Sequence, residues 1–231
     1  MLRQESIDEF LPWGVRAFTT TRAAGSFGTG TNEPADAVAR RWEVVREALL
    51  PFGPRFTTAR QVHGNSVVRH DDGWLGWRRV DGADGHFAAS RGTGMAVTVA
   101  DCVPVFVAHQ SGACALLHSG WRGTVARIIE CGIAAFRTSA FAPADLRVHL
   151  GPAICGRCYE VSPDVYAQLT GRVVERPATV DLRAILAGHA AAQGVRGITI
   201  SPFCTRCDNA RFFSHRAGDA GRQLGVMIAE V

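Results

Sequence analysis

A cysteine and a histidine lie at the two ends of an apolar stretch that can fold back on itself. Residues 95–100, 103–108 and 113–117 are apolar and rich in β-branched side chains, and the polar HQSG before the last of them is typical of a turn. An antiparallel hairpin of 103–108 with 113–118 places the residue opposite His118 within about three positions of Cys102. We therefore expect the thiol and the imidazole within roughly 10 Å of each other, where they could share a metal ion or a proton.

The loop after this hairpin adds a positive charge. It reads HSGWRGT, with Arg122 between two glycines, and it precedes a helix predicted by the 3–4 apolar spacing of residues 125–136. Free backbone N–H groups and a guanidinium indicate an anion pocket beside His118. Asp101 directly precedes Cys102 in an apolar stretch, where an acid is costly without a partner, so we expect it to support the site. The alternative is a purely structural Cys/His pair.

Two further segments have both a chemical and a structural interpretation. His63, in QVHGN, lies at a break between extended runs, where a side chain can point out of a sheet; the alternative is a plain turn histidine. The glycine-rich residues 23–32 match no phosphate-binding motif and are either a flexible connection or a flap that faces substrate. Asp81 and Asp84 are expected first to form turns and only second to belong to a site.

Four of the seven cysteines form two CxxC pairs, Cys155 with Cys158 and Cys204 with Cys207. Together they resemble a four-thiolate zinc site. The interval between the pairs exceeds the roughly 15 to 20 residues of a compact zinc ribbon, which favours ordinary reduced thiols. A thioredoxin-like redox role is also disfavoured, because no strand–helix context follows CGRC. An odd cysteine count without a secretory signal argues against a disulfide framework.

The composition is that of a globular domain. The chain has 231 residues, 47% of them hydrophobic and 20% charged. Its net charge is +4, and arginine supplies all of the positive charge because the sequence contains no lysine. The arginines are scattered, so we expect no nucleic-acid binding, whereas anionic small molecules are compatible with the charge. No apolar stretch is long enough to span a membrane, and the N-terminus lacks the pattern of a signal peptide. These features predict a cytoplasmic protein without a membrane partner.

Strands and helices alternate along the chain without a regular βαβ rhythm. Residues 35–49, 163–170 and 182–193 have helical spacing with capping signals, whereas the glycine- and tryptophan-rich residues 72–90 are expected to be a loop leading to a strand. We find no repeat or linker. The sequence therefore predicts one α+β domain over residues 1–231, with mixed or antiparallel sheets flanked by helices.

The motifs QVHG, TVADCVPV, HSGWRGT, GPAI with YEV, and CTRCDNARFFSHR occur in the order and spacing of the YfiH family. Its members have been called laccase-domain or multicopper polyphenol oxidase-like proteins, and the chain resembles them from about Phe18 to its C-terminus. The resemblance implies a layered α/β/β/α sandwich and one catalytic zinc ion bound by His63, Cys102 and His118. Copper is disfavoured, because these residues form one site and supply no further histidine pairs for a copper cluster.

The resemblance also implies a function. Such proteins are zinc-dependent purine nucleoside phosphorylases, so the expected partners are phosphate and a purine nucleoside, namely adenosine, inosine or methylthioadenosine, with deamination of adenosine as a second reaction. Two imidazoles and one thiolate leave the fourth position of a tetrahedral zinc ion open, as catalytic sites do. Arg122 is the residue we expect to bind phosphate or a ribose hydroxyl.

Other functions use the same residues. Without a metal, Cys102 would be a nucleophile and His118 its base, as in cysteine hydrolases, and the family fold is similar to that of a deamidating bacterial toxin. Some family members resemble editors of peptidoglycan precursors. Polyphenol oxidation and metal binding without catalysis are further alternatives. The H-x-E and P-C-x-x-C signature of zinc nucleobase deaminases is missing from the sequence.

Overall fold

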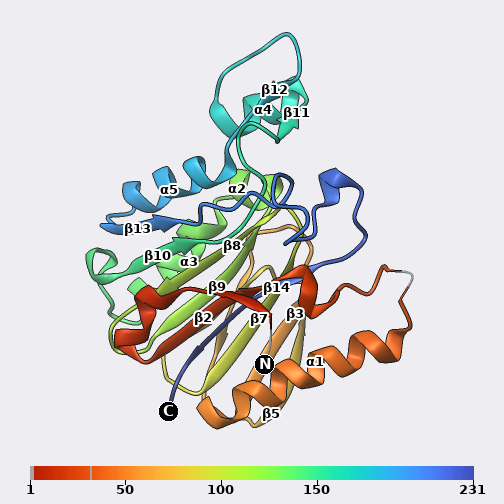
Figure 1. Cartoon of the computed structure of the whole chain (residues 1–231). Helices are drawn as coiled ribbons and strands as arrows, with labels where there is room; N and C mark the ends of the chain where they lie inside the picture. Colours follow the sequence, from red (N-terminus) through yellow and green to blue (C-terminus); the bar gives the residue numbers. More distant parts are fainter. Residues whose placement is uncertain (1–2, 32) are drawn as a thin grey trace.

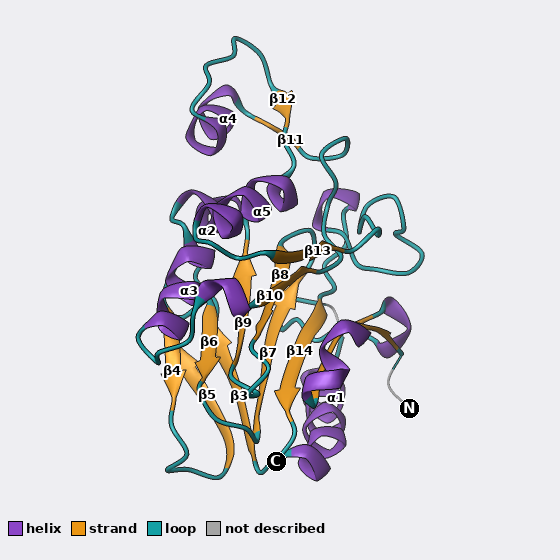
Figure 2. Cartoon of the chain, turned by 90° about the vertical axis from the view of Figure 1, so that its left-hand side faces the viewer, coloured by secondary structure: helices purple, strands orange, loops and turns teal. Residues whose placement is uncertain are grey.

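Two six-stranded sheets pack face to face in the computed structural model, which describes residues 3–31 and 33–231 (Figures 1 and 2). The first sheet has the strand order β1 (Gln4–Ser6), β2 (Val15–Thr20), β14 (Gln223–Ala229), β7 (Thr93–Val99), β3 (Arg55–Arg60) and β5 (Gly76–Asp81). The second has the order β13 (Gly197–Ile200), β10 (Arg147–Leu150), β8 (Val103–Ala108), β9 (Cys114–Ser119), β6 (Gly85–Ala88) and β4 (Val67–His70). A separate antiparallel pair consists of β11 (Glu160–Val161) and β12 (Ala178–Thr179).

Both large sheets are mixed. Strand β3 is parallel to β5 and β7, β10 is parallel to β13, and β4 is parallel to β6, whereas the other neighbours are antiparallel. The predicted α+β class with mixed sheets is thus confirmed.

Helices cover the outer faces of the sheets (Figure 2). The α-helices are α1 (Ala35–Leu49), α2 (Trp121–Val125), α3 (Ile128–Arg137), α4 (Pro163–Thr170) and α5 (Leu182–Ala192), and 3-10 turns span Asp8–Trp13, Arg22–Ala24, Leu50–Phe52, Pro143–Asp145 and His215–Ala217. Helix α1 packs on the first sheet, while α3 and α5 pack on the second. Helix α4 and the β11–β12 pair extend beyond one end of the sandwich (Figure 1). The α/β/β/α layering implied by the family resemblance is therefore confirmed.

The middle of the sandwich is filled by fully buried side chains from both sheets. Met95 and Met227 of the first sheet meet Phe106 and Leu116 of the second. Every residue of β8, β9 and β14 is buried, because each strand has packed layers on both faces. These central strands form the rigid frame from which the loops at their ends project.

Two local expectations are wrong. Residues 76–81 lie in strand β5 rather than in a loop, because β3 supplies a parallel partner for a segment whose sequence is rich in turn formers. The helix expected over 125–136 begins earlier and is broken into α2 and α3 at Arg127, whose φ of 62° is left-handed. The helices at 35–49 and 182–192 are confirmed, the latter with Asp181 accepting two backbone N–H groups at its N-terminus.

Nowhere in residues 3–31 and 33–231 is a helix both long enough and apolar enough to cross a bilayer.

Candidate metal and substrate site

Two loops and the end of one strand bring His63, Cys102 and His118 together. His63 lies in the turn between β3 and β4, Cys102 lies between β7 and β8, and His118 lies near the end of β9. One ligand atom from each residue lies within 4.8 Å of those of the other two. The two imidazole rings are edge to face, with centroids 4.8 Å apart and an interplanar angle of 84°. One metal ion could bind all three groups.

The register of the β8–β9 hairpin lies within the range that the sequence predicted. Pro104 is paired with His118 and Val103 with Ser119, so Cys102 lies just beyond the last pair. Because both strands are buried on both faces, this register is fixed by packing and not by the turn alone. The convergence of the Cys102 thiol and the His118 imidazole is therefore a property of a rigid element.

Left-handed backbone conformations accompany two of the three positions. His63 has φ 60° and Asp101, which precedes Cys102, has φ 80°, values that non-glycine residues rarely adopt. The Asp101 carboxylate accepts hydrogen bonds from the Thr205 hydroxyl (2.6 Å) and the Arg216 backbone N–H (2.7 Å). Asp101 thus does have partners, but they lie in the C-terminal loop and not among the three ligand candidates. Its carboxylate holds the strained turn that presents Cys102.

The acid that contacts the candidate ligands directly is Asp84, which is fully buried. Its Oδ1 accepts hydrogen bonds from His118 Nδ1 (2.8 Å) and the His63 backbone N–H (2.9 Å), while Oδ2 accepts those of Val62 (3.1 Å) and Gly64 (2.8 Å). Burial alone would raise the pKa of Asp84, but these donors lower it. The carboxylate orients the His118 ring, leaving its Nε2 for the site, and holds the backbone turn that carries His63.

The thiol and the imidazole shift each other's pKa. Burial raises the pKa of Cys102, but His118 and then His63 outweigh it and lower this pKa to about 6. Burial lowers the pKa of His118, but the Cys102 charge and the Asp84 hydrogen bond raise it to about 9. Both pKa shifts favour the thiolate–imidazolium form of the pair, and the thiolate is the form that binds metals.

Gly120 leaves room for these side chains. A Cβ atom at this position would lie 2.9 Å from Cys102 Sγ and 3.3 Å from His63 Cδ2. Side chains do not approach that closely, so only glycine fits without displacing a ligand candidate. This close approach explains the glycine that follows HS in the motif HSGWRGT.

A pocket of about 690 Å³ extends from Cys102 and His118 to the space between the first sheet and α1. Its apolar wall includes Trp42 of α1 and Trp77 of β5, whose rings stack with centroids 5.8 Å apart, and Phe27, which meets Trp42 edge to face. The indole N–H groups donate to Phe27 O and Thr58 Oγ1, both at 3.1 Å. With these polar atoms already paired, the wall is suited to a flat aromatic ligand.

The polar end of the pocket contains His215 and Arg222 from the C-terminal loop. Both residues also line an adjoining hollow of about 460 Å³, together with Thr29. Arg222 donates through Nη1 to the carbonyls of Ala220 (3.0 Å) and Gly221 (2.8 Å), which fixes the direction of its guanidinium. The glycine-rich loop thus borders both hollows, as the substrate-facing alternative for that loop requires.

Arg122 occupies a different place. It is exposed, its guanidinium lies 4.3 Å from the ring centroid of Trp121, and it is not among the residues that line the two hollows. Burial and the Cys102 charge raise the pKa of Tyr159 to about 12, against the opposing charges of Arg216 and Arg122. Whether Arg122 binds substrate stays a prediction.

Sequence reasoning missed the support and the walls of the site. Asp84 was expected mainly to form a turn, and Trp42, Trp77, His215 and Arg222 were not assigned to a site. For Asp84 the available signal was an acid entering an apolar strand, GHFAA, which is as costly as the acid at Asp101. His215 belongs to the family motif CTRCDNARFFSHR, but no local pattern places it beside Trp42, Trp77 and Arg222, because these residues come from elements far apart in sequence.

Comparisons with known proteins agree on one family. Residues 17–230 match the family model described as multi-copper polyphenol oxidoreductase laccase. A purine nucleoside phosphorylase from Streptomyces griseus is 32% identical over 212 residues, covering 87% of this chain and 84% of the relative. A purine nucleoside phosphorylase from Corynebacterium glutamicum is 31% identical over 230 residues, covering 92% of this chain and 94% of the relative.

Solved structures show the same fold. The hypothetical protein YfiH from Bacillus licheniformis superposes with a TM-score of 0.89 at 24% identity, covering 100% of this chain and 97% of that chain. YlmD from Geobacillus stearothermophilus superposes with a TM-score of 0.85 at 27% identity, covering 95% of this chain and 94% of that chain.

Proposed function

Because the chain belongs to the family described as multi-copper polyphenol oxidoreductase laccase, which confirms its resemblance to YfiH proteins, we propose that it is a zinc-dependent purine nucleoside phosphorylase. Relatives that match most of the chain carry the name purine nucleoside phosphorylase. The observation that carries the proposal is that His63, Cys102 and His118 line the same pocket as two stacked tryptophans. Adenosine, inosine and methylthioadenosine are the proposed substrates.

The donor set fits zinc. Two imidazoles and one thiolate are ligands that zinc prefers, and three protein ligands leave one position for a substrate oxygen or water. Zinc bound there would supply a Lewis acid beside the pocket. The family name refers to several copper ions, but within the described residues the only other group of this kind consists of cysteines alone, without the histidines of a copper cluster.

Different residues of the pocket would bind different parts of the substrate. In phosphorolysis a phosphate oxygen forms a bond to the ribose C1′ while the bond from C1′ to the base nitrogen breaks, and the base leaves with the electron pair and takes up a proton. Trp42 and Trp77 would stack on the purine and hold it. The ribose would then lie between the tryptophans and Cys102, so that binding orients C1′ toward the nucleophile.

Phosphate requires a cation or several donors. Arg222 and His215 line both hollows, so they are proposed to bind it on the pocket side. Arg122 of α2 is the second proposed anion-binding residue. Separate Arg222→Lys and Arg122→Lys variants distinguish the two candidates. The variant that raises the KM for phosphate about tenfold or more, with zinc content unchanged, identifies the residue that binds the anion.

The decisive experiment incubates zinc-loaded protein with each nucleoside, with and without phosphate, and separates the products by chromatography. A phosphorylase releases free base only when phosphate is present, and Cys102→Ala abolishes this release. Conversion of adenosine to inosine without phosphate would show the proposed second reaction, deamination by the same site. Absence of any nucleoside turnover by zinc-loaded protein would refute the proposed function.

One observation favours a second candidate function. The low pKa of Cys102 and the high pKa of His118 are the properties of a nucleophilic thiolate with its acid–base partner. As a cysteine hydrolase the protein would keep its activity after chelation and lose it on thiol alkylation. A zinc enzyme shows the opposite response to the chelator, so one pair of measurements separates the two.

A further inference from the structure

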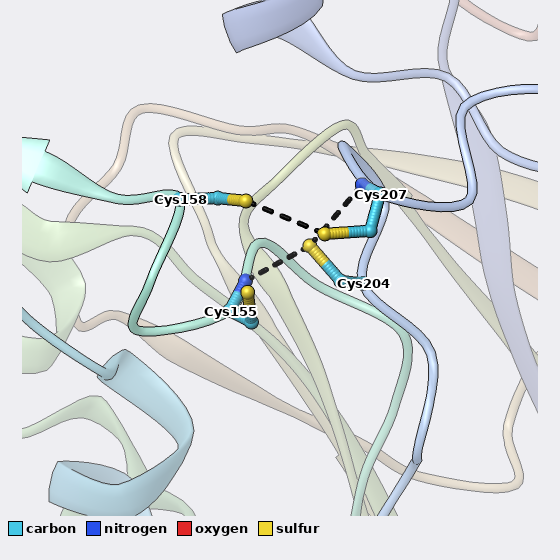
Figure 3. Close-up of side chains that lie close together, drawn as sticks. All are labelled: Cys155, Cys158, Cys204 and Cys207. Atoms are coloured by element: carbon cyan, nitrogen blue, oxygen red, sulfur yellow. Dashed lines mark hydrogen bonds between the residues drawn. The ribbon is translucent and has the colours of Figure 1, made fainter.

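We propose that Cys155, Cys158, Cys204 and Cys207 form a second zinc site, a structural one with four thiolate ligands (Figure 3). The four side chains come from two loops, and Figure 3 shows them directed toward one another. The sequence spacing favoured ordinary reduced thiols; the structure keeps all four as free cysteines and brings them together. The inference does not depend on the proposed nucleoside chemistry.

The folding topology brings the two CxxC pairs together. Strands β10 and β13 are parallel neighbours, so their C-terminal ends lie at the same edge of the second sheet. Cys155 follows the end of β10 at Leu150, and Cys204 follows the end of β13 at Ile200. A parallel bridge between Ala153 and Cys204 continues this pairing into the loops. Residues 49 positions apart in sequence thus become neighbours.

The distances suit a tetrahedral ion. All four sulfur atoms lie within 4.8 Å of one another, and Cys158 Sγ lies 3.4 Å from Cys207 Sγ. Zinc–sulfur bonds of about 2.3 Å place the sulfurs of a tetrahedral site about 3.8 Å apart. Small side-chain adjustments would therefore bring the four thiolates to one ion.

Backbone donors stabilise negative charge on Cys204, although burial raises its pKa in the metal-free protein. The N–H groups of Cys155 and Cys207 donate to Cys204 Sγ at 3.2 and 3.4 Å. The Asp208 carboxylate accepts the Cys204 N–H at 2.9 Å, which closes the second turn. Hydrogen bonds of this kind favour the thiolate over the thiol, and the thiolate is the metal ligand.

Positive side chains accompany both turns. The third residue of each CxxC is arginine, Arg157 in the first and Arg206 in the second. Arg206 donates to the carbonyl of Cys158 at 3.3 Å and so links the two turns. Four thiolates around a divalent zinc ion carry a net charge of −2, which the neighbouring guanidinium of Arg206 would partly offset.

Disulfides explain the arrangement less well. Two disulfides would use all four thiols, but each would join only one pair of sulfurs, whereas here all four cysteines are free and every sulfur lies within reach of the other three. Four sulfurs within mutual reach, two from each of two loops, are the pattern of a closed structural zinc site.

This second site would also support the first. Thr205 lies between two of the cysteines, and its hydroxyl donates to Asp101 Oδ1 at 2.6 Å. Ile154, just before Cys155, donates its N–H to the Asp101 carbonyl at 3.1 Å. Asp101 in turn holds the left-handed turn before Cys102. Zinc at the four cysteines would thus fix both loops that position Cys102.

The test counts metal by elemental analysis after purification under reducing conditions. Wild-type protein should hold about two zinc ions per chain, and Cys102→Ala about one. The double variant Cys204→Ser with Cys207→Ser should also hold about one, and it should bind zinc at the remaining site about tenfold more weakly than wild type does. Cys131→Ser is the matched control, because Cys131 lies on α3 outside both groups, and it should keep both ions.

A second measurement keeps the inference testable if the double variant fails to fold. X-ray absorption at the zinc edge of folded Cys102→Ala protein should show sulfur ligands only, at about 2.3 Å. Three results would each overturn the second site. The first is the same zinc content in the double variant as in wild type, and the second is nitrogen ligands in the Cys102→Ala spectrum. The third is a mass of the denatured, metal-free protein that is four hydrogens below that of the reduced chain, which would show two disulfides. Loss of nucleoside turnover alone would not, since it concerns the first site.

Discussion

Asp84→Asn tests how far Asp84 supports the His63, Cys102 and His118 site, because it leaves all three candidate ligands in place. The carboxylate accepts four hydrogen bonds, two at each oxygen, and an asparagine amide keeps only one acceptor. If the amide nitrogen replaces Oδ2, it faces the N–H groups of Val62 and Gly64. If it replaces Oδ1, it faces the His63 N–H and His118 Nδ1.

The second orientation is the cheaper one. His118 can change tautomer so that Nδ1 accepts from the amide, which leaves only the His63 N–H without an acceptor, at a cost of about 1–3 kcal/mol. The tautomer change places the proton on Nε2, where the metal would bind. We therefore expect unfolding of the metal-stripped variant to require about 1–3 kcal/mol less than wild type, and zinc affinity to fall about 10- to 100-fold.

Chemical denaturation measures the first quantity, and competition with a chromophoric chelator measures the second. Glu9→Gln is the matched control, because Glu9 also contacts a histidine, His149 Nδ1 at 3.0 Å, but belongs to neither metal-ligand group. It should lose some stability and keep its zinc affinity. Unchanged zinc affinity in Asp84→Asn, or an equal loss in both variants, would refute the role of Asp84 in orienting His118.

Three further outcomes are expected. Gly120→Ala should lower zinc content measured by elemental analysis, because its Cβ would lie 2.9 Å from Cys102 Sγ. Trp77→Ala should raise the KM for nucleoside about tenfold or more, while the KM for phosphate stays nearly constant. The reason is that loss of one ring from the Trp42–Trp77 stack weakens base binding by about 1–3 kcal/mol, the amount typical of aromatic stacking. In metal-stripped protein the alkylation rate of Cys102, measured by mass spectrometry, should persist as the pH falls from 9 to about 6 and decline only below that, because the lowered pKa of Cys102 preserves the thiolate at lower pH. A midpoint near pH 9 would contradict this.

Residues near in sequence determined part of the site without the tertiary structure. The turn HQSG and its flanking apolar strands predict a hairpin that brings Cys102 near His118, whereas burial of both strands fixes the pairing of Pro104 with His118. The helix over residues 35–49 likewise follows from its own spacing and from the breakers at its ends. The ligand motif that contains His63 could be recognised only by resemblance, because a turn histidine has no local feature that marks it as a ligand.

The tertiary structure decided everything that depends on which strands become neighbours. Asp84 reaches His118 and the His63 turn only because β6 pairs with β9, and Trp77 faces Trp42 only because its segment adds to the first sheet as β5. The four cysteines meet because β10 and β13 are parallel neighbours, which makes a long sequence interval short in space. Strand order is set by the burial of whole sheet faces and not by any single segment, so these contacts have no local signature in the sequence.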